Sequence, residues 1–498
     1  MQKKPMYEMH KYWGKKPSES VLYYILKYSK EGHNILDPFS GYGVIACEAF
    51  LNNRNVISND LNPISNFINK NLLDLNFDEK LLKESWNKIR EDFAILNRSL
   101  FSLQDGTEVI SILRNKYDIP LMIKYKQGKQ SIERELTLDE RQYLIDIENS
   151  TKLECWFPTD DLIENSRISA KKDMKVQSLF TKRELICLAK LFDLISSVSQ
   201  EKIKSLLLFA FSANLANCSK LVPPIKSRGK MSQGAWMTGF YVGENYIENN
   251  VLHYFENRLR KVILGKREFI EKAKNVKSTY KITNYDCKNL CKIKSNSIDY
   301  IITDPPYGAT VPYFEQSIIW NSWLKFETNF NDEIVISNSM VRCKSEDNYE
   351  IDILQAYTEI ARVLKDDSYF TFTFHSLSGK VWNSIISACI QNKFEFVELN
   401  WLKQITFTPR QLNRNITPLG DLTITLKKSN TTNLTNFAEN TECLKEYLSE
   451  KTGLYCTNSI YVIIIEFLFK NRLIIKNLDI LKFLSNNYDM QENKWIIK

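Results

Sequence analysis

The sequence of 498 residues lacks a hydrophobic run long enough to cross a membrane. Its longest apolar run, residues 461–469, is interrupted by Glu466, whereas a spanning helix needs about 20 apolar residues. The N-terminus has lysines and a tryptophan but no apolar core of the kind found in secretory signal peptides. These absences predict a cytoplasmic protein.

A metal-binding pattern of cysteines is also missing. The ten cysteines are scattered, and only Cys287 and Cys291 lie close together, with three residues between them. No second pair and no histidine lies at the short spacing that zinc ligands need. We therefore expect reduced thiols and no metal site.

Charge of one sign is in only small excess, with 67 Lys and Arg against 59 Asp and Glu and a net charge of +8. An excess of this size permits a polyanionic partner without requiring one. The hydrophobic content of 43% and the charged content of 25% are typical of a globular protein, and the length allows two or three domains.

The most informative stretch is an apolar run at residues 298–302 that two prolines end at once. Such a run is typical of a buried strand, and each proline fixes its own φ and removes an N–H donor. The strand would deliver a carboxylate to the carboxyl edge of an α/β sheet, where ligands bind. The turn consists of Asp304, Pro305, Pro306 and Tyr307.

This turn suits chemistry on the exocyclic amino group of a nucleobase, whose lone pair is delocalised into the ring. The Asp304 carboxylate and the Pro305 carbonyl are two acceptors that would draw the nitrogen toward tetrahedral geometry and free its lone pair. Tyr307 offers an aromatic face on which an extruded base stacks. An ordinary strand-to-loop turn is the alternative, because short motifs recur by chance.

A second motif near the N-terminus predicts the first half of a nucleotide-binding crossover. A short strand ends at residues 35–36, and a turn containing Gly41 and Gly43 leads into a helix at residues 44–51. Glycines let backbone amides approach a ligand closely, and the helix N-terminus favours a negative group. Asp60 follows the next strand, about 20 residues past the turn, where an acid accepts hydrogen bonds from a ribose.

Strand and helix alternate on both sides of a long interruption, so one sheet is expected from two halves of the chain. The pattern lapses after about residue 75 and resumes with a strand at residues 280–286, which ends in Asp286. The predicted domains are a split catalytic domain (1–78 and 278–428), a mainly helical insert (79–277) and a small helical C-terminal domain (429–498).

Positive charge gathers in the insert, next to aromatic residues. Basic loops interleaved with aromatics suit a phosphate backbone and unstacked bases, although solvated helix faces are the alternative. The candidates for nucleic-acid binding are Lys220, Lys226, Arg228 and Lys230, followed by Trp236 and Tyr241; further basic clusters contain Lys182, Arg183, Arg258 and Lys266.

With these motifs in order, the chain resembles the S-adenosylmethionine-dependent DNA amino-methyltransferases of the adenine-specific kind. Residues 37–43 are similar to the cofactor loop of that family and residues 304–307 to its catalytic tetrad. Residues 11–17 resemble the segment that closes over the methionine end of the cofactor. The resemblance covers about residues 7–427.

The resemblance implies a Rossmann-like methyltransferase fold with a seven-stranded, mostly parallel sheet, S-adenosylmethionine as cofactor and double-stranded DNA as substrate. By analogy, Asp60 would bind the ribose hydroxyls and Asp286 the adenine amino group of the cofactor. The insert would carry target recognition, and the setting would be restriction–modification or phage defence, with a cognate restriction endonuclease as a candidate partner. The implied cofactor residues are Lys11, Tyr12, Trp13, Asp37, Pro38, Phe39, Gly41, Gly43, Asp60 and Asp286.

Several departures from the family pattern leave other readings open. Tyr42 and Val44 stand where a small residue and a threonine are usual, and Gly308 follows the tetrad, as it does in RNA guanine-amino methylases. The alternatives are a cytosine N4 methylase, an RNA guanine-amino methylase and a catalytically silent nucleic-acid-binding protein. Asp304 disfavours the cytosine branch, which more often has serine there, and the intact motifs disfavour a silent protein.

Overall fold

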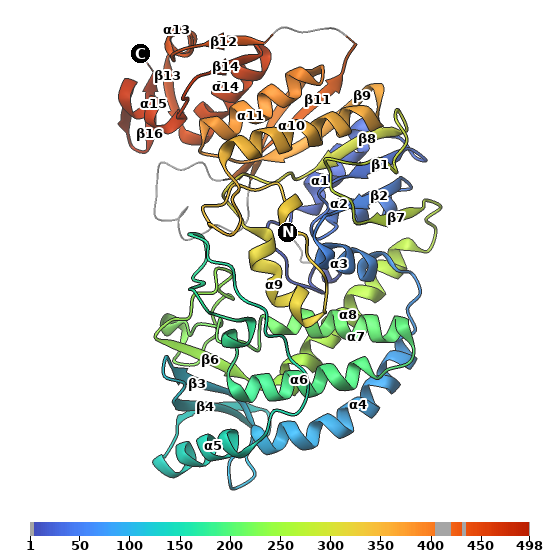
Figure 1. Ribbon diagram of the computed structural model, residues 1–498, viewed down its shortest axis with the longest axis vertical. Helices are drawn as coiled ribbons and strands as arrows, with labels where there is room; N and C mark the ends of the chain where they lie inside the picture. Colours follow the sequence, from blue (N-terminus) through green and yellow to red (C-terminus); the bar gives the residue numbers. More distant parts are fainter. Residues whose placement is uncertain (1–3, 404–419, 431–434, 498) are drawn as a thin grey trace. The chain divides into compact units, whose positions relative to one another are not determined.

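The computed structural model describes residues 4–403, 420–430 and 435–497 (Figure 1). The chain divides into two compact units. Unit 1 consists of Met1–Gly14, Phe67–Asn275 and Tyr313–Thr328, and unit 2 consists of Lys15–Asn66, Val276–Pro312 and Asn329–Lys498.

A seven-stranded sheet forms the core of unit 2, in the order β10-β11-β9-β8-β1-β2-β7. Every neighbouring pair is parallel except the two pairs made by β11, which runs antiparallel to β9 and to β10. The strands are β1 Asn34–Asp37, β2 Asn55–Asn59, β7 Tyr280–Thr283, β8 Ile298–Thr303, β9 Leu364–Phe374, β10 Phe394–Lys403 and β11 Gly420–Lys428. The prediction of an α/β unit with a mostly parallel seven-stranded sheet is confirmed.

The hydrophobic pattern explains why these segments form the sheet. Parallel strands covered on both faces are nearly continuous in apolar residues, and β8 buries Ile298 and every residue from Tyr300 to Thr303. The helices of unit 2 include α1 Ser18–Tyr28, α2 Val44–Leu51, α10 Glu346–Val363 and α11 Gly379–Gln391, and α2 buries every residue from Val44 to Phe50. Figure 1 shows α10 and α11 lying over the part of the sheet formed by β9 to β11. The buried side chains of these two helices and the phenylalanines of β9 belong to one hydrophobic core.

The register of β1 and β8 decides where the two sequence motifs meet. Ile35 pairs with Tyr300 and Leu36 with Ile301, so the two parallel strands end side by side at Asp37 and Thr303. The loops that follow them therefore leave from the same edge of the sheet. β7 ends at Thr283, so Asp286 lies in the loop beyond the strand rather than at its last residue.

The sequence predicted a helical C-terminal domain, but the C-terminal part of unit 2 contains short strands as well as helices. Among residues 435–497, β12 pairs with β14, and β16 lies between β13 and β15. These strands have only three or four residues each, too few to give a clear alternation in the sequence. The elements are β12 Asn436–Ala438, α13 Glu442–Ser449, β13 Gly453–Cys456, α14 Thr457–Lys470, β14 Leu473–Ile475, α15 Ile480–Asn487, β15 Asp489–Gln491 and β16 Lys494–Ile497.

The long apolar run of the sequence lies in α14, where Tyr461, Ile464, Ile465 and Leu468 are buried in the core of unit 2. Among the residues that the structure describes, no helix is both long enough and apolar enough to traverse a bilayer.

The insert is mainly helical, as predicted, but unit 1 also contains a four-stranded antiparallel sheet in the order β5-β4-β3-β6, which the sequence did not reveal. Burial differs along this sheet: β3 is buried at most positions, whereas β5, at its edge, has no buried residue. The elements are α4 Glu79–Leu100, β3 Val109–Asn115, β4 Pro120–Gln127, β5 Gln130–Glu135, α5 Leu138–Ser150, α6 Lys182–Ser196, α7 Glu201–Leu215, β6 Asn245–Asn249, α8 Val251–Ala273 and α9 Tyr313–Trp323.

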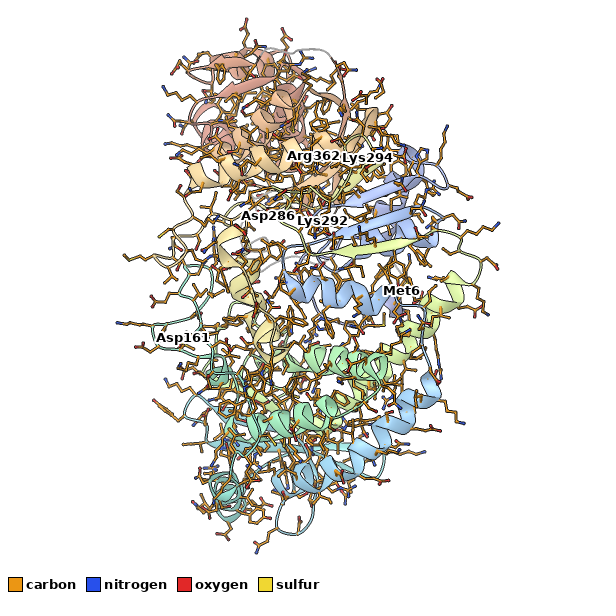
Figure 2. All side chains as sticks on the ribbon, turned by 45° about the vertical axis from the view of Figure 1, so that its right-hand side comes forward. Met6, Asp161, Asp286, Lys292, Lys294 and Arg362 are labelled. Atoms are coloured by element: carbon orange, nitrogen blue, oxygen red, sulfur yellow. The ribbon has the colours of Figure 1, made fainter. Side chains whose placement is uncertain are left out.

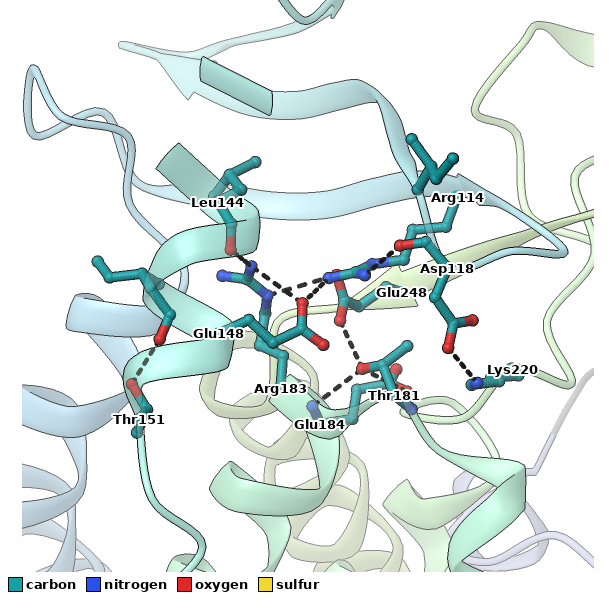
Figure 3. A network of polar contacts seen from close by, with 12 residues as sticks. Arg114, Asp118, Leu144, Glu148, Thr151, Thr181, Arg183, Glu184, Lys220 and Glu248 are labelled. Atoms are coloured by element: carbon teal, nitrogen blue, oxygen red, sulfur yellow. Dashed lines mark hydrogen bonds and ion pairs between the residues drawn. The ribbon is translucent and has the colours of Figure 1, made fainter. Parts of the chain in front are cut away.

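Charged side chains buried inside unit 1 join its sheet to its helices (Figure 3). Arg114 donates to Glu248 at 2.7 Å and also to Glu148, while Arg183 donates to the carbonyl of Leu144 at 2.7 Å. The guanidinium of Arg183 lies 3.4 Å from Glu148 and 3.6 Å from Glu248. Arg183 is fully buried, so its charge serves this network and is not available to a phosphate backbone.

Lys266 is a second basic residue that the fold withdraws from the surface. It is fully buried, and its ammonium donates to the carbonyls of Asn71 at 2.9 Å, of Leu72 at 3.3 Å and of Asp74. It therefore satisfies the carbonyls that end α3 (Pro63–Leu73), a role that does not involve a ligand.

The buried network predicts a large stability effect. Arg183→Ala leaves Arg114 alone against the carboxylates of Glu148 and Glu248, so we expect the free energy of unfolding to fall by ~3–5 kcal/mol. Lys182→Ala is the matched control, because the neighbouring Lys182 is exposed and should change stability by about 0.5 kcal/mol or less. Urea unfolding measures both, and equal losses in the two variants would contradict this account.

Candidate active site

The last residues of β1 and β8 are joined directly. Thr303 donates its hydroxyl hydrogen to Asp37 Oδ1 at 2.6 Å, and the Phe39 N–H reaches the same oxygen at 3.3 Å. Asp37 is 1% exposed, and its other oxygen, Oδ2, has no hydrogen-bond partner among the described residues. Burial raises the pKa of Asp37 to about 8, against the hydrogen bonds from Thr303 and Phe39 that lower it.

The glycine turn after β1 depends on its two glycines. Gly41 has φ 47° and Gly43 has φ 91°, conformations in which an L side chain would be strained. Gly43 is also the residue that caps the N-terminus of α2. The N–H groups of Gly41 and Gly43 bond to Asp60 and to the Ser40 carbonyl, which fixes the turn, and the N-terminus of α2 follows it, where the first N–H groups of a helix have no partner within the helix.

Asp60 ties the end of β2 to this glycine turn. Its Oδ2 accepts the Gly41 N–H and its Oδ1 accepts the Asn62 N–H, each at 2.8 Å. Burial raises the pKa of Asp60, and the two backbone donors oppose that shift. Each carboxylate oxygen has a second acceptor site, so these contacts are compatible with a ribose hydroxyl as a further donor.

The tetrad turn begins directly after β8 and is held from several sides. Asp304 Oδ1 accepts the Thr373 hydroxyl at 2.6 Å and also the hydroxyl of Tyr307. The Tyr307 ring meets Phe374 edge to face, with centroids 5.2 Å apart and planes at 71°. The Tyr349 hydroxyl donates to the Pro306 carbonyl at 2.8 Å. The carboxylate and the ring therefore have fixed positions before any substrate binds.

Lys16 and Asp421 also belong to this site. The sequence placed Lys16 only in the segment that resembles the one closing over the cofactor, and it did not reveal Asp421. Lys16 Nζ lies 3.1 Å from Asp304 Oδ2, and it donates to Asp421 Oδ2 and to the Tyr307 hydroxyl, each at 2.8 Å. The Lys16 side chain is 9% exposed. One signal was available: Asp421 directly precedes the alternating apolar residues of β11, whose positions 420–426 are all buried, and a buried carboxylate needs a partner.

Electrostatic effects at Asp304 oppose one another. Burial raises the pKa of Asp304, the Lys16 ammonium lowers it, and the neighbouring Asp421 raises it. Burial alone would lower the pKa of Lys16, but the carboxylates of Asp304 and Asp421 outweigh burial and raise it. His375, which follows β9, has a lowered pKa because of burial.

The other predicted cofactor residues fall into two groups. Asp286, labelled in Figure 2, is in unit 2, where its Oδ1 accepts the Lys288 N–H at 2.9 Å. Lys11, Tyr12 and Trp13 belong to unit 1. There Lys11 donates to Asn217 at 2.7 Å, and burial lowers its pKa to about 7, with Arg258 and Lys261 adding to the shift.

Tyr12 and Trp13 form an aromatic cluster within unit 1. The ring of Trp13 lies 4.9 Å from that of Trp320 and 6.2 Å from that of Trp236, and Tyr12 stacks on Tyr313 at 6.4 Å. The aromatic residues that precede the first helix thus pack on the insert and on α9.

The basic loop of the insert is a short antiparallel turn, with Pro224 bridged to Gln233. Arg228 and Lys230 are exposed on it, and Lys230 lies 3.1 Å from Glu135. Lys220 is partly buried and pairs with Asp118 at 2.7 Å. The side chain of Lys226 lies outside the described residues.

A comparison with protein families supports the assignment of a methyltransferase. A family described as DNA methylase matches residues 2–68, which contain the glycine turn and Asp60. This match supports a DNA methyltransferase. Comparison with curated proteins gives no match.

Among solved structures, an rRNA methyltransferase from Streptomyces viridochromogenes aligns with a TM-score of 0.30 and 9% identity. The alignment covers 86% of this chain and 94% of that protein. In the part of the chain that the structure describes, no group of three or more His, Cys, Asp or Glu side chains is arranged to hold a metal ion.

The burial of Asp37 predicts a pH-dependent stability. Asp37 ionises near pH 4 in the unfolded chain but only near pH 8 in the folded protein. Between these two values, each rise in pH favours the unfolded state and lowers the free energy of unfolding. Asp37→Asn removes this effect, and the stability of the variant relative to the wild type should rise by up to ~1.4 kcal/mol per pH unit over that window.

Asp299→Asn is the matched control, since Asp299 pairs with Lys365 and has a lowered pKa despite its partial burial. This variant should lose stability above about pH 4, where the ionised Asp299 stabilises the wild type, and should match the wild type below its lowered folded pKa. Urea unfolding of the ligand-free protein from pH 3 to pH 8 measures both, and parallel slopes would contradict the assignment.

Proposed function

We propose that this protein transfers a methyl group from S-adenosylmethionine to the N6 amino group of adenine in DNA. The observation that carries the proposal is the geometry of Asp304, whose carboxylate is fixed by Thr373, Tyr307 and Lys16 beside the strand that leads into the glycine turn. A carboxylate held in this way accepts a hydrogen bond from an amino group without needing to reorganise.

The residues of the turn have separate roles in the proposed reaction. Asp304 and the Pro305 carbonyl accept the two N–H groups of the target amine, so that the lone pair of its nitrogen points away from the ring. Tyr307 packs against the extruded base. When bound, S-adenosylmethionine supplies an activated methyl group on its sulfonium, so positioning provides most of the rate. The methylated nitrogen then releases its extra proton.

The residues at the edge of the sheet fit the cofactor. The buried Oδ2 of Asp37 has no partner in the described structure, and an unsatisfied buried carboxylate is costly unless a donor or a cation reaches it. S-adenosylmethionine brings both an ammonium and a sulfonium. Gly41 and Gly43, which have no Cβ, would let the methionine end of the cofactor approach the backbone and the N-terminus of α2, while Asp60 would hold its ribose and Asp286 its adenine amino group.

The choice of adenine rests on Asp304 and on the residue after the tetrad. Gly308 also occurs in RNA guanine-amino methylases, but here its φ of 68° and its close packing account for it: a Cβ would lie 3.0 Å from Ile336 Cδ1 and 3.1 Å from Val381 Cγ2. This glycine is therefore explained without an RNA substrate. We assign the defence setting and a partner endonuclease to the same proposal on the resemblance alone.

The cofactor assignment predicts a binding defect at the glycine turn. Gly43→Ala places a side chain at φ 91°, which costs about 1–2 kcal/mol of stability, and it disturbs the amides at the start of α2. Gly32→Ala is the control, because Gly32 has a comparable φ of 79° in a turn with open space around it. Both variants should lose stability, and only Gly43→Ala should bind S-adenosylmethionine at least tenfold more weakly in calorimetry. Equal affinities would contradict the assignment.

The catalytic assignment predicts that Asp304→Ala abolishes methyl transfer while cofactor binding survives. The variant lacks the acceptor that orients the amine, but the glycine turn is unchanged. Transfer of label from S-adenosylmethionine to plasmid DNA measures the first effect, and calorimetry measures the second. Retained transfer in Asp304→Ala would remove the mechanism.

A further inference from the structure

The contacts around Asp304 form a closed set of hydrogen bonds with one opening. A carboxylate has about four acceptor sites, two on each oxygen. On Oδ1, the hydroxyls of Thr373 and Tyr307 use both sites. On Oδ2, Lys16 uses one, and no other contact from the described residues reaches this oxygen. One site therefore stays open to a substrate.

The N–H and O–H donors around Asp304 all have acceptors within this set. Lys16 has three N–H groups, and three oxygens surround it: those of Asp304, Asp421 and the Tyr307 hydroxyl. The Tyr307 hydroxyl accepts from Lys16 and donates to Asp304. Lys16 precedes α1, Asp421 lies on β11, and Thr373 lies on β9, so three separate elements fix the carboxylate.

We propose that Lys16, held in place by Asp421, is a positioning residue that keeps Asp304 ionised and leaves it a single open acceptor for the target amino group. The inference rests on the proposed function and deepens it. It assigns Lys16 and Asp421 to the reaction, although neither belongs to the tetrad or to the cofactor loop.

The charges around Asp304 explain why a cation is needed. Asp421 faces it through the shared Lys16, and Asp37 on β1 is a further carboxylate near enough to interact. The other titratable groups that face this cluster are Tyr307 on the tetrad turn and His375 after β9. Without Lys16, two carboxyls would share a buried site with no cation, and one of them would hold a proton.

A protonated Asp304 fails in two ways. Its hydroxyl becomes a donor, which cannot orient the N–H group of an amine, and its negative charge no longer stabilises the positive charge that develops on the attacked nitrogen. Lys16 prevents both by favouring the carboxylate form, while Asp421 prevents Lys16 from moving into the open acceptor site. The rate of methyl transfer should therefore fall when residue 16 loses its positive charge.

The test is the pH profile of kcat for labelled methyl transfer to plasmid DNA, at saturating S-adenosylmethionine, from pH 5 to pH 10. In Lys16→Met, loss of the cation should move the acid limb upward by at least one pH unit. The rate at neutral pH should fall at least tenfold and recover at high pH. Calorimetric binding of S-adenosylmethionine should stay within about threefold of the wild type, which a disrupted fold would not allow.

Three further variants separate charge from structure. Lys16→Arg keeps the charge, so its acid limb should stay within half a pH unit even if its rate falls. Asp421→Asn removes a negative charge near Asp304, so the acid limb of its pH profile should not move upward. Its rate should still drop, because Lys16 is no longer held in place. Lys27→Met is the matched control, because Lys27 lies on α1, the helix that follows Lys16, and forms a lysine–carboxylate pair with Glu398 away from Asp304. This variant should leave the profile unchanged.

An acid limb in Lys16→Met that coincides with that of the wild type overturns the inference. Should Lys16→Met not fold, Lys16→Gln carries the same expectation, since it keeps a donor toward Asp421 without the charge. If the wild type itself transfers no label to DNA, the proposed function fails. Transfer by the wild type with an unshifted variant limb refutes only the role of Lys16.

Discussion

The hydrogen bond from Thr303 to Asp37 is the contact on which the site depends. It joins the last residues of two adjacent parallel strands, and the register of those strands admits no slip without turning every buried side chain of β1 to the other face. The glycine turn and the tetrad turn begin one residue beyond this contact. Two motifs separated by more than 250 residues thus leave the sheet at the same place.

Burial of acidic groups is the second constraint. Asp37, Asp60, Asp304 and Asp421 are carboxyls at or near one edge of a sheet, and each has a different form of compensation. Asp60 uses backbone N–H groups, Asp304 uses two hydroxyls and an ammonium, and Asp421 shares that ammonium. Of these four carboxyls, only Asp37 has a buried oxygen without a partner among the described residues. A cationic ligand near Asp37 would satisfy this oxygen.

The sheet was predictable because most of its strands are short apolar runs that end in polar turns, and the helix predicted at residues 44–51 is α2, with those bounds. The sheet of unit 1 was missed because its strands do not alternate: β3 is buried at consecutive positions and β5 at none. The pairing of Lys16 with Asp421 was missed for a different reason: it depends on a tertiary contact between residues 405 positions apart, which no local pattern encodes.

The identity of the methylated base tests the account most directly. Incubation with labelled S-adenosylmethionine and plasmid DNA, followed by digestion to nucleosides, reports which base receives the methyl group. The account predicts label in N6-methyldeoxyadenosine and no label when Asp304 is replaced by alanine. Label in N4-methyldeoxycytidine, or in RNA but not in DNA, would contradict it.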